Sequence, residues 1–347
     1  MDLTTVWFLL IAVLWTGYFV LEGFDFGVGM LLPVVSRDET DRRVALGTIG
    51  PVWDGNEVWL LVAGGATFAA FPEWYASLFS GFYLALLLIL VALILRGMAL
   101  EYRGKIDDDT WRRRWDAAIV GGSLVPALLW GVAFGNIVRG VPLDADHEYT
   151  GTFFTLLNPF ALLGGVTTVL LFALHGAVFL ALKTTGEVRT RAIRVASVAG
   201  PLLVVAGGAF LAWAVFGYGP LWTMIPAAVA AVGLVVGTVL AIRGREGWAF
   251  LATAGAIVAI VVTLFGTLFP DVLPATDPAN SLTTTNAAST PYTLTIMTWV
   301  AVVITPIVLA YQAWTFWVFR RRLTRTDVEG EAGLVLPRPL RKGAHAG

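Results

Sequence analysis

The segment FYLALLLILVALILRG (residues 82–97) is apolar without a break until it reaches Arg96. A helix needs about 20 predominantly apolar residues to cross a bilayer, and residues 77–100 supply that length. Similar runs recur along the 347 residues, of which 57% are hydrophobic and 14% are charged, whereas roughly a quarter of the residues in soluble domains are charged. The sequence therefore predicts an all-α polytopic membrane protein.

Nine membrane spans are expected, and the first of them is long enough to tilt within the bilayer. They cover residues 6–32, 50–71, 77–100, 117–138, 157–181, 194–216, 222–242, 248–269 and 294–319. We expect residues 1–326 to form a single transmembrane domain and residues 327–347 to form a polar cytoplasmic tail. The connections at 139–156 and 270–293 are expected to be irregular surface loops.

Basic residues are concentrated on one side of these spans. The opposite side receives Arg139 at most, whereas the basic side receives Arg37, Arg42, Arg43, Arg103, Lys105, Arg112 to Arg114, Lys183, Arg189, Arg191, Arg194, Arg243, Arg245 and the tail from Arg320 to Lys342. Cytoplasmic loops of membrane proteins carry an excess of Lys and Arg. We therefore expect the N-terminus outside and the C-terminus in the cytoplasm, which agrees with an odd number of spans.

Several classes of function find no support in the composition. The chain contains no cysteine, which excludes disulfide bonds, thiol catalysis and cysteine-ligated metal or haem sites. The net charge of −1 gives no indication of a nucleic-acid partner. The N-terminal sequence MDLTTVWFLL lacks a basic region and a small-residue cleavage site, so it predicts a first span rather than a signal peptide.

Ionisable residues occur within the first three spans, in positions that predict a common depth. The first and third spans run inwards, so their late residues reach the same level as the early residues of the second span. The layer expected on the cytoplasmic side consists of Glu22, Asp25, Asp54, Glu57, Arg96 and, just below it at the interface, Glu101. Glu22 and Asp25 share a helix face because they are three residues apart, and so do Asp54 and Glu57.

Two interpretations of this layer remain open. Arg96 could neutralise one carboxylate and hold three helices together, because an unpaired charge in lipid costs several kcal/mol. However, the acids outnumber the arginine, and excess buried carboxylates tend to exchange protons. A row of acids that opens to one side is what a proton relay needs.

Other polar and small residues within the spans suggest packing roles. His175 is the only histidine in a predicted span; a haem with two axial ligands would need a second ligand such as Met30 or Met98. We expect His175 to be a core histidine that is hydrogen-bonded to its surroundings. The patterns Gly23/Gly27 and Gly233/Gly237, and the pair Gly64–Gly65, predict close helix contacts.

Several motifs together resemble subunit II of the cytochrome bd quinol oxidases over nearly the whole chain. They are LEGFDFGVGMLLP (21–33), GPVWDGNEVWLLVAGGATFAAFP (50–72), FSGFYLALLLILVALILRGMALEYRGK (79–105), WGVAFGNIVRGVP (130–142), FFTLLNPFALLGG (153–165) and MTWVAVVITPIVLAYQAW (297–314). The resemblance implies a complex in the bacterial cytoplasmic membrane that oxidises quinol and reduces dioxygen to water. It also implies that the protons for this reaction come from the cytoplasm.

The same resemblance implies a partner and roles for individual residues. A homologous subunit I would carry two b-type haems and one d-type haem, while this chain would bind no haem itself and would stabilise that partner. Asp25, Asp54, Arg96 and Glu101 match proton-conducting positions of the family, although some relatives have Asp at the position of Glu101. Trp59 matches a residue that lines the family's oxygen path. A small accessory subunit and a structural quinone stay open, and lipid is an expected partner.

Two competing functions use the same residues. A proton-coupled secondary transporter would also place acids within the membrane, but such proteins usually show inverted repeats and broken helices at the midplane. The acid layer of this chain is instead off-centre and one-sided. The other alternative is a scaffold that only stabilises the haem-carrying subunit.

Overall fold

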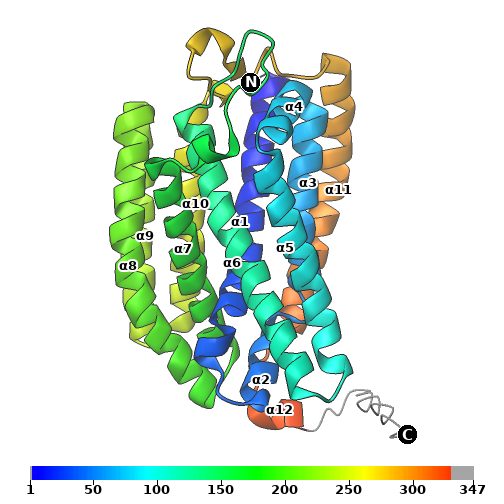
Figure 1. Ribbon diagram of the computed structural model, residues 1–347, viewed down its shortest axis with the longest axis vertical. Helices are drawn as coiled ribbons and strands as arrows, with labels where there is room; N and C mark the ends of the chain where they lie inside the picture. Colours follow the sequence, from blue (N-terminus) through cyan, green and yellow to red (C-terminus); the bar gives the residue numbers. More distant parts are fainter. Residues whose placement is uncertain (1, 330–347) are drawn as a thin grey trace, which may run out of the picture.

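The computed structural model describes residues 2–329 as a bundle of long helices (Figure 1). Each expected span falls on one of them: α1 (Leu3–Val35), α3 (Trp53–Ala70), α5 (Tyr83–Tyr102), α6 (Asp109–Arg139), α7 (Pro159–Lys183), α8 (Gly186–Tyr218), α9 (Met224–Ile242), α10 (Glu246–Leu268) and α11 (Pro291–Val318). Among residues 2–329, eight helices are long and apolar enough to cross a membrane. The ninth, α3, is not among them because Asp54, Asn56 and Glu57 make its first turns polar.

Short elements connect the long helices. They are α2 (Glu39–Ile49), α4 (Pro72–Gly81), α12 (Arg325–Glu329), the single turns η1 (Arg103–Lys105), η2 (Phe153–Leu156), η3 (Leu221–Thr223) and η4 (Pro278–Asn280), and the antiparallel strands β1 (Asp271–Leu273) and β2 (Leu282–Thr283). The expected third span begins too early, because residues 77–81 belong to α4. The helix is interrupted at Phe82, between α4 and α5. Apolar residues flank Phe82 on both sides, so the sequence does not reveal this interruption.

The helix starts follow simple local rules. Asp2, Asp38, Asp108, Asn158 and Thr290 are N-cap residues whose side-chain oxygens accept hydrogen bonds from backbone N–H groups in the first turn. Such caps satisfy donors that have no partner within the helix. Proline also occupies the first helical position of α4, α7 and α11, where its missing N–H costs nothing.

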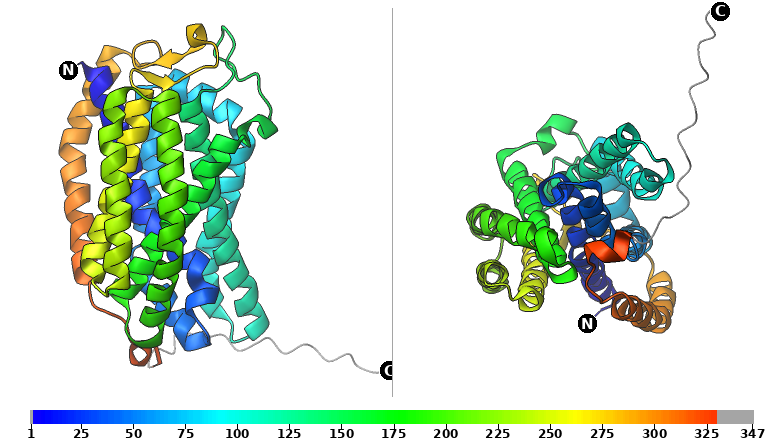
Figure 2. Two further views of the ribbon diagram at one scale, coloured as in Figure 1. Left: turned by 90° about the vertical axis from the view of Figure 1, so that its left-hand side faces the viewer. Right: turned by 90° about the horizontal axis from the view of Figure 1, so that it is seen from below.

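Helix α1 occupies the middle of the bundle and contacts α3, α6, α7 and α10 (Figure 2). Its segment from Glu22 to Gly29 is buried on every side, which is the pattern of a helix enclosed by others. Gly27 allows this enclosure, because a Cβ atom there would lie 2.0 Å from the carbonyl oxygen of Phe172 and 2.7 Å from the Cα atom of Gly176. The predicted close contact at Gly23/Gly27 is therefore confirmed, between α1 and α7.

The other predicted glycine contacts had mixed outcomes. Gly233 and Gly237 of α9 approach Ala256 and Thr253 of α10 closely, as predicted. The prediction for Gly64–Gly65 is wrong for the part of the chain that the structure describes, because no atom of residues 2–329 lies within 4 Å of a Cβ built at either residue. Both glycines line an open apolar cavity instead. The sequence pattern identifies a smooth helix surface but does not say whether another helix covers it.

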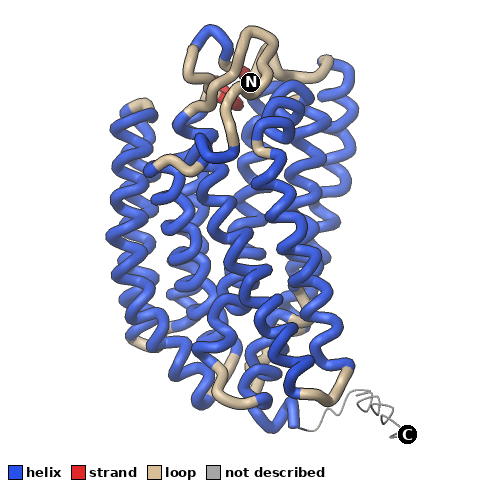
Figure 3. Tube along the Cα trace, in the orientation of Figure 1, coloured by secondary structure: helices blue, strands red, loops and turns tan. Residues whose placement is uncertain are grey.

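The two ends of the bundle differ in charge. One end, called the basic end below, carries α2, α12, η1 and the α7–α8, α9–α10 and α11–α12 connections, with their arginines and lysines (Figure 1). The other end, called the loop end, carries the start of α1, residues 140–158 and the β1–β2 hairpin; Figure 3 shows the strands beside the N-terminus. The expected irregular loop at 270–293 thus contains a short hairpin.

The expected division of the chain at residue 326 falls inside α12. Arg325 of this helix donates hydrogen bonds of 2.7 Å to Asp41 and 2.9 Å to Asp38, which attach α12 to α2. The rest of the expected tail, residues 330–347, lies outside the described residues.

Helix α11 stands at the edge of the bundle, beside α1 and α3 (Figure 1). Only 6% of its apolar segment is buried within this chain. Trp7 of α1 holds its upper part by donating from Nε1 to the carbonyl oxygen of Leu294 and to Thr298 Oγ1, at 3.2 and 3.1 Å. At the basic end, Lys183 donates to the carbonyl oxygens of Phe319 and Arg321 just after the helix.

Candidate functional site

An ionic cluster lies inside the bundle, in the half nearer the basic end. Its residues come from three helices that pack around one another: Glu22 and Asp25 from the centre of α1, Asn56 and Glu57 from the first turns of α3, and Arg96 from the last two turns of α5. The antiparallel course of α1 and α3 brings late residues of one level with early residues of the other. The common depth expected from the sequence arises in this way.

Arg96 and Glu22 form a fully buried ion pair. Arg96 Nη1 donates to Glu22 Oε1, and both side chains have no exposed surface. The guanidinium also lies 4.9 Å from the ring centroid of Phe26, a favourable cation–π distance. Gly122 of α6 makes room for Arg96, because a Cβ atom there would lie 2.7 Å from that of the arginine.

Asp25 and Asn56 belong to a hydrogen-bond chain that reaches the edge of the bundle. Asn56 Nδ2 donates to Asp25 Oδ2 at 2.7 Å, and Gln312 Nε2 of α11 donates to Asn56 Oδ1 at 2.9 Å. Asp25 and Asn56 are fully buried, and Gln312 is partly buried. One carboxylate of α1 is thereby connected through α3 to α11.

The cluster contains more hydrogen-bonding capacity than it uses. Within residues 2–329, no partner reaches Glu22 Oε2, Asp25 Oδ1, or Nε and Nη2 of Arg96. Leaving a buried polar group unpaired costs about 1–3 kcal/mol. Two buried carboxylates therefore share one arginine, and each of them retains an oxygen atom that can accept a proton.

The remaining predicted residues lie further out. Glu57 is half-buried and within electrostatic reach of Arg96 and Glu22. Asp54 is exposed, one turn before Glu57 on α3 and close enough to it for their charges to interact. Glu101 is exposed at the end of α5, and its side chain makes no ion pair or hydrogen bond within residues 2–329. The fold thus gathers Glu22, Asp25, Glu57 and Arg96, places Asp54 beside them, and leaves Glu101 apart.

His175 is fully buried and hydrogen-bonded through both ring nitrogens. Nδ1 lies 2.7 Å from Thr253 Oγ1, Nε2 lies 3.1 Å from the carbonyl oxygen of Val20, and the ring stacks on Phe250 at 4.7 Å. The expectation of a core histidine is confirmed. Both nitrogens that a metal would need are already engaged by α1 and α10.

A second ionic group at the basic end was not predicted. Asp41 of α2 is fully buried and accepts hydrogen bonds from Arg191 and Arg325, both at 2.7 Å. Arg103 bridges Glu39 and Asp116 in the same region. The backbone N–H of Asp41 and the guanidinium of Arg325 lower the pKa of Asp38 below its ordinary value. These pairs join α2, α6, α8 and α12 and close this end of the bundle.

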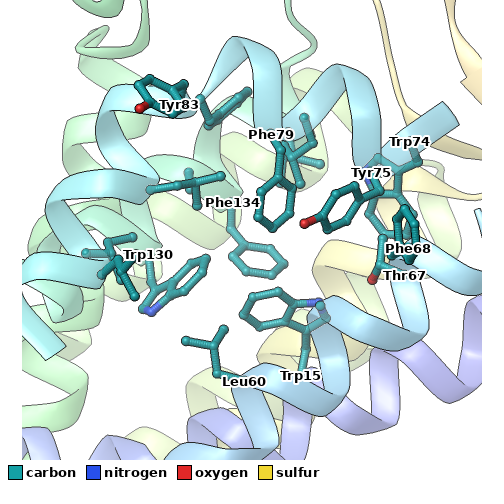
Figure 4. A pocket seen from close by; sticks show the side chains of 18 of the residues that line it. Trp15, Leu60, Thr67, Phe68, Trp74, Tyr75, Phe79, Tyr83, Trp130 and Phe134 are labelled. Carbon is teal, nitrogen blue, oxygen red and sulfur yellow. The ribbon is translucent and has the colours of Figure 1, made fainter. Parts of the chain in front are cut away.

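An apolar cavity of about 490 Å³ lies in the opposite half, nearer the loop end (Figure 4). Its walls come from α1, α3, α4, α5, α6 and α10. The rings of Trp15, Trp130 and Phe134 pack edge to face at its base, with centroids 4.9 and 5.0 Å apart. Trp59 is not among the lining residues and instead packs over Gly17 of α1. Leu60 and Leu61 line the cavity in its place.

Asn56 and Gln312 are the residues of the cluster whose contacts the sequence did not predict. Asn56 stands out only as an amide beside two acids. Gln312 is the single charged or amide side chain in α11, a signal that could have marked it. Its partner lies 256 positions away in the sequence, however, so no local pattern indicates the contact.

Comparison with known proteins relates most of the chain to one family. The family model for cytochrome bd terminal oxidase subunit II matches residues 3–319. The chain is 41% identical to the cytochrome bd-I ubiquinol oxidase subunit 2 of Escherichia coli strain K12, with 93% of this chain and 96% of that protein covered. It is 40% identical to the cytochrome bd ubiquinol oxidase subunit 2 of Bacillus subtilis strain 168, with 94% and 98% covered.

A solved structure shares the fold. A chain of the bd oxidase from Geobacillus thermodenitrificans superposes with a TM-score of 0.67 at 17% identity, and 95% of this chain and 100% of that chain are covered. The bundle of long helices, the matched family model and the identity to the two relatives agree with one another. This multi-pass membrane protein therefore belongs to the cytochrome bd terminal oxidase subunit II family.

Proposed function

We propose that this chain is the haem-free subunit of a quinol oxidase and supplies protons for the reduction of dioxygen to water. It would do so beside a haem-carrying subunit I, in a bacterial cytoplasmic membrane. The observation that carries this proposal is the pair of fully buried carboxylates, Glu22 and Asp25, that share the single guanidinium of Arg96. Structural neutralisation requires one acid for one arginine, so the second acid is available for proton exchange.

The arrangement of the acids supports a direction for proton uptake. Asp54 is exposed, Glu57 is half-buried, and Asp25 and Glu22 are fully buried, so the acids lead from the surface of this chain into its interior. Arg96 would hold the innermost carboxylates in place by its charge. Glu101 would attract protons at the membrane surface, because it is exposed and apart from the others.

The distribution of basic residues supports the side from which protons enter. The cluster lies nearer the basic end, and basic loops face the cytoplasm in most membrane proteins. We infer that the basic end is cytoplasmic and the loop end is outside. Protons would then be taken from the cytoplasm, and a lipid bilayer would surround the exposed apolar faces of the helices.

A path for oxygen is a second proposal, and the apolar cavity near the loop end favours it. Dioxygen is small and apolar, so an aromatic-lined space of this kind would admit it from the membrane. Trp59 would support the wall from behind rather than line it, since its ring lies against Gly17.

Substitution of the acids in the purified two-subunit complex tests proton uptake. We expect Asp25→Asn and Asp54→Asn to retain haem and to slow oxygen reduction, Asp25→Asn by roughly a hundredfold, as befits a lost proton-transfer group. Glu73→Gln is a matched control, because Glu73 is an exposed acid at the loop end. Loss of haem together with activity would favour a scaffold, and full activity would remove the substituted acid from the path.

A further inference from the structure

We propose that Gln312 is a positioning residue for proton uptake: through Asn56 it fixes which oxygen atom of Asp25 takes up the proton. This inference rests on the proposed function of Asp25. It adds α11, a helix with no charged side chain, to the site. The observation that supports this proposal is the continuous chain of hydrogen bonds from Gln312 to Asn56 to Asp25, at 2.9 and 2.7 Å.

The donor and acceptor directions in this chain of hydrogen bonds follow from the chemistry of the groups that form it. An ionised carboxylate only accepts hydrogen bonds, so Asn56 must present its NH₂ group to Asp25 Oδ2. The amide oxygen of Asn56 then faces away from Asp25 and needs a donor, which Gln312 provides through Nε2. Without that donor, the buried Asn56 amide could turn over and present its oxygen to Asp25 instead.

When the Asn56 amide is held in this orientation, only one oxygen atom of Asp25 is free to bind a proton. Oδ2 is occupied by the N–H of Asn56, whereas Oδ1 has no partner within residues 2–329. The charged groups around Asp25 are Arg96 of α5, Glu57 of α3 and Glu22 of its own helix; His175 of α7 is bonded to Val20 and Thr253. With the Asn56 amide fixed, uptake and release both occur at Oδ1.

The position of Gln312 at the edge of the bundle makes this arrangement adjustable. α11 is scarcely buried within this chain, and Gln312 Oε1 lies 3.9 Å from a Cβ built on Gly55 of α3. This is an ordinary van der Waals distance, so the glutamine amide lies directly against the first turn of α3. A displacement of α11 would break the hydrogen bond between Gln312 and Asn56. It would thereby change the hydrogen bond that Asp25 accepts from Asn56, without any movement of α1.

Two substitutions of Gln312 in the purified two-subunit complex separate positioning from packing. Gln312→Glu has nearly the same shape, but its ionised carboxylate cannot donate to Asn56, whereas its protonated form can. We therefore expect near-normal oxygen reduction at acid pH and a rate about tenfold lower at alkaline pH, the upper end of the effect of one lost hydrogen bond between neutral groups. Gln312→Leu should be about tenfold slower at every pH, because it never donates.

The matched control is Thr315→Val on the same helix, because the Thr315 hydroxyl bonds only to the carbonyl oxygen of Tyr311 one turn earlier. This variant should keep the wild-type rate and pH profile. Wild-type rates and profiles in both Gln312 variants, with Asp25→Asn slow, would overturn the positioning role and leave proton uptake standing. Full activity of Asp25→Asn would overturn both. Loss of haem in both Gln312 variants would assign Gln312 to assembly and also overturn the proposal.

Discussion

Arg96 is the residue on which the buried charge balance depends. It is the single guanidinium within the cluster, and it faces two fully buried carboxylates from α1. Taking any of these charges out of water is costly, and the cost is recovered only while the opposite charges stay together. The arginine therefore has a structural task even if the acids around it carry protons.

Removing Arg96 should harm assembly more than chemistry. We expect Arg96→Ala to destabilise the complex by about 3–5 kcal/mol, because it leaves a buried carboxylate without its counter-charge. Haem content and the midpoint temperature of thermal unfolding of the purified complex measure this effect. The double variant Arg96→Met with Glu22→Gln removes both charges and should recover much of the haem. A stable Arg96→Ala complex with full haem content would contradict the role of Arg96 in charge compensation.

At the scale of the elements, the contact between α1 and α7 sets the position of the cluster. Gly27 and Gly176 let the two backbones touch only two residues beyond Asp25 on α1. Close approach of this kind strengthens packing between helices in a membrane, where the hydrophobic effect does not drive association. The small residues thus fix the depth at which α1 presents its acids to α3 and α5.

A single methyl group at this contact should disturb the site from a distance. Gly27→Ala would place a Cβ atom 2.0 Å from the carbonyl oxygen of Phe172, so the helices must separate. We expect a loss of stability of roughly 1–3 kcal/mol, the usual cost of overpacking, measured by thermal unfolding of the purified complex. Gly208→Ala in α8 is the control, because no atom lies within 4 Å of a Cβ there. Equal unfolding temperatures for the two variants would show that the contact is not tight.

At the scale of the whole molecule, the polar cluster and the apolar cavity occupy opposite halves of the bundle. The cluster lies among α1, α3 and α5 towards the basic end, and the cavity lies between α1, α3, α4, α5, α6 and α10 towards the loop end. This separation suits a charged and an apolar reactant that approach from different sides. The same three helices form part of both regions.

Filling the cavity should impede oxygen without disturbing protons. Gly65 lines the cavity, and no atom of residues 2–329 lies within 4 Å of a Cβ built there, so Gly65→Phe would place an aromatic ring at the cavity. We expect the KM for oxygen to rise severalfold while the haem content and the pH profile stay unchanged. Gly208→Phe places the same ring on α8, away from the cavity, and should leave the KM unaltered. An unchanged KM in both variants would mean that oxygen takes another route.

The partner of this chain can be tested by purification from the native membrane. We expect the chain to copurify with a haem-carrying subunit and to show a reduced-minus-oxidised haem spectrum. The chain expressed alone should show none, since Val20 and Thr253 engage both ring nitrogens of His175, the one histidine in the long helices that the structure describes. A haem-free protein that moves protons in response to a solute would instead indicate a secondary transporter.

The sequence by itself indicated the long apolar helices, their approximate limits and the ionisable residues that lie within them. These follow from apolar length and from the cost of placing charge in lipid, both of which are local properties of the chain. Family membership rested on motifs of the same kind. The break at Phe82 and the hairpin at β1–β2 escaped this reasoning, because their neighbours in sequence look like an uninterrupted span and an ordinary loop.

Only the tertiary structure decided how the residues pair. Glu22 rather than Asp25 binds Arg96, Glu101 stays apart, Gly64 and Gly65 face a cavity, and Gln312 reaches Asn56 across 256 positions. The physical reason is that the sequence shows which face of a helix carries polar residues or small residues. It does not show the rotation of the helix, its tilt or its neighbours. Those are settled by packing around the buried α1, which joins segments that are distant in the chain.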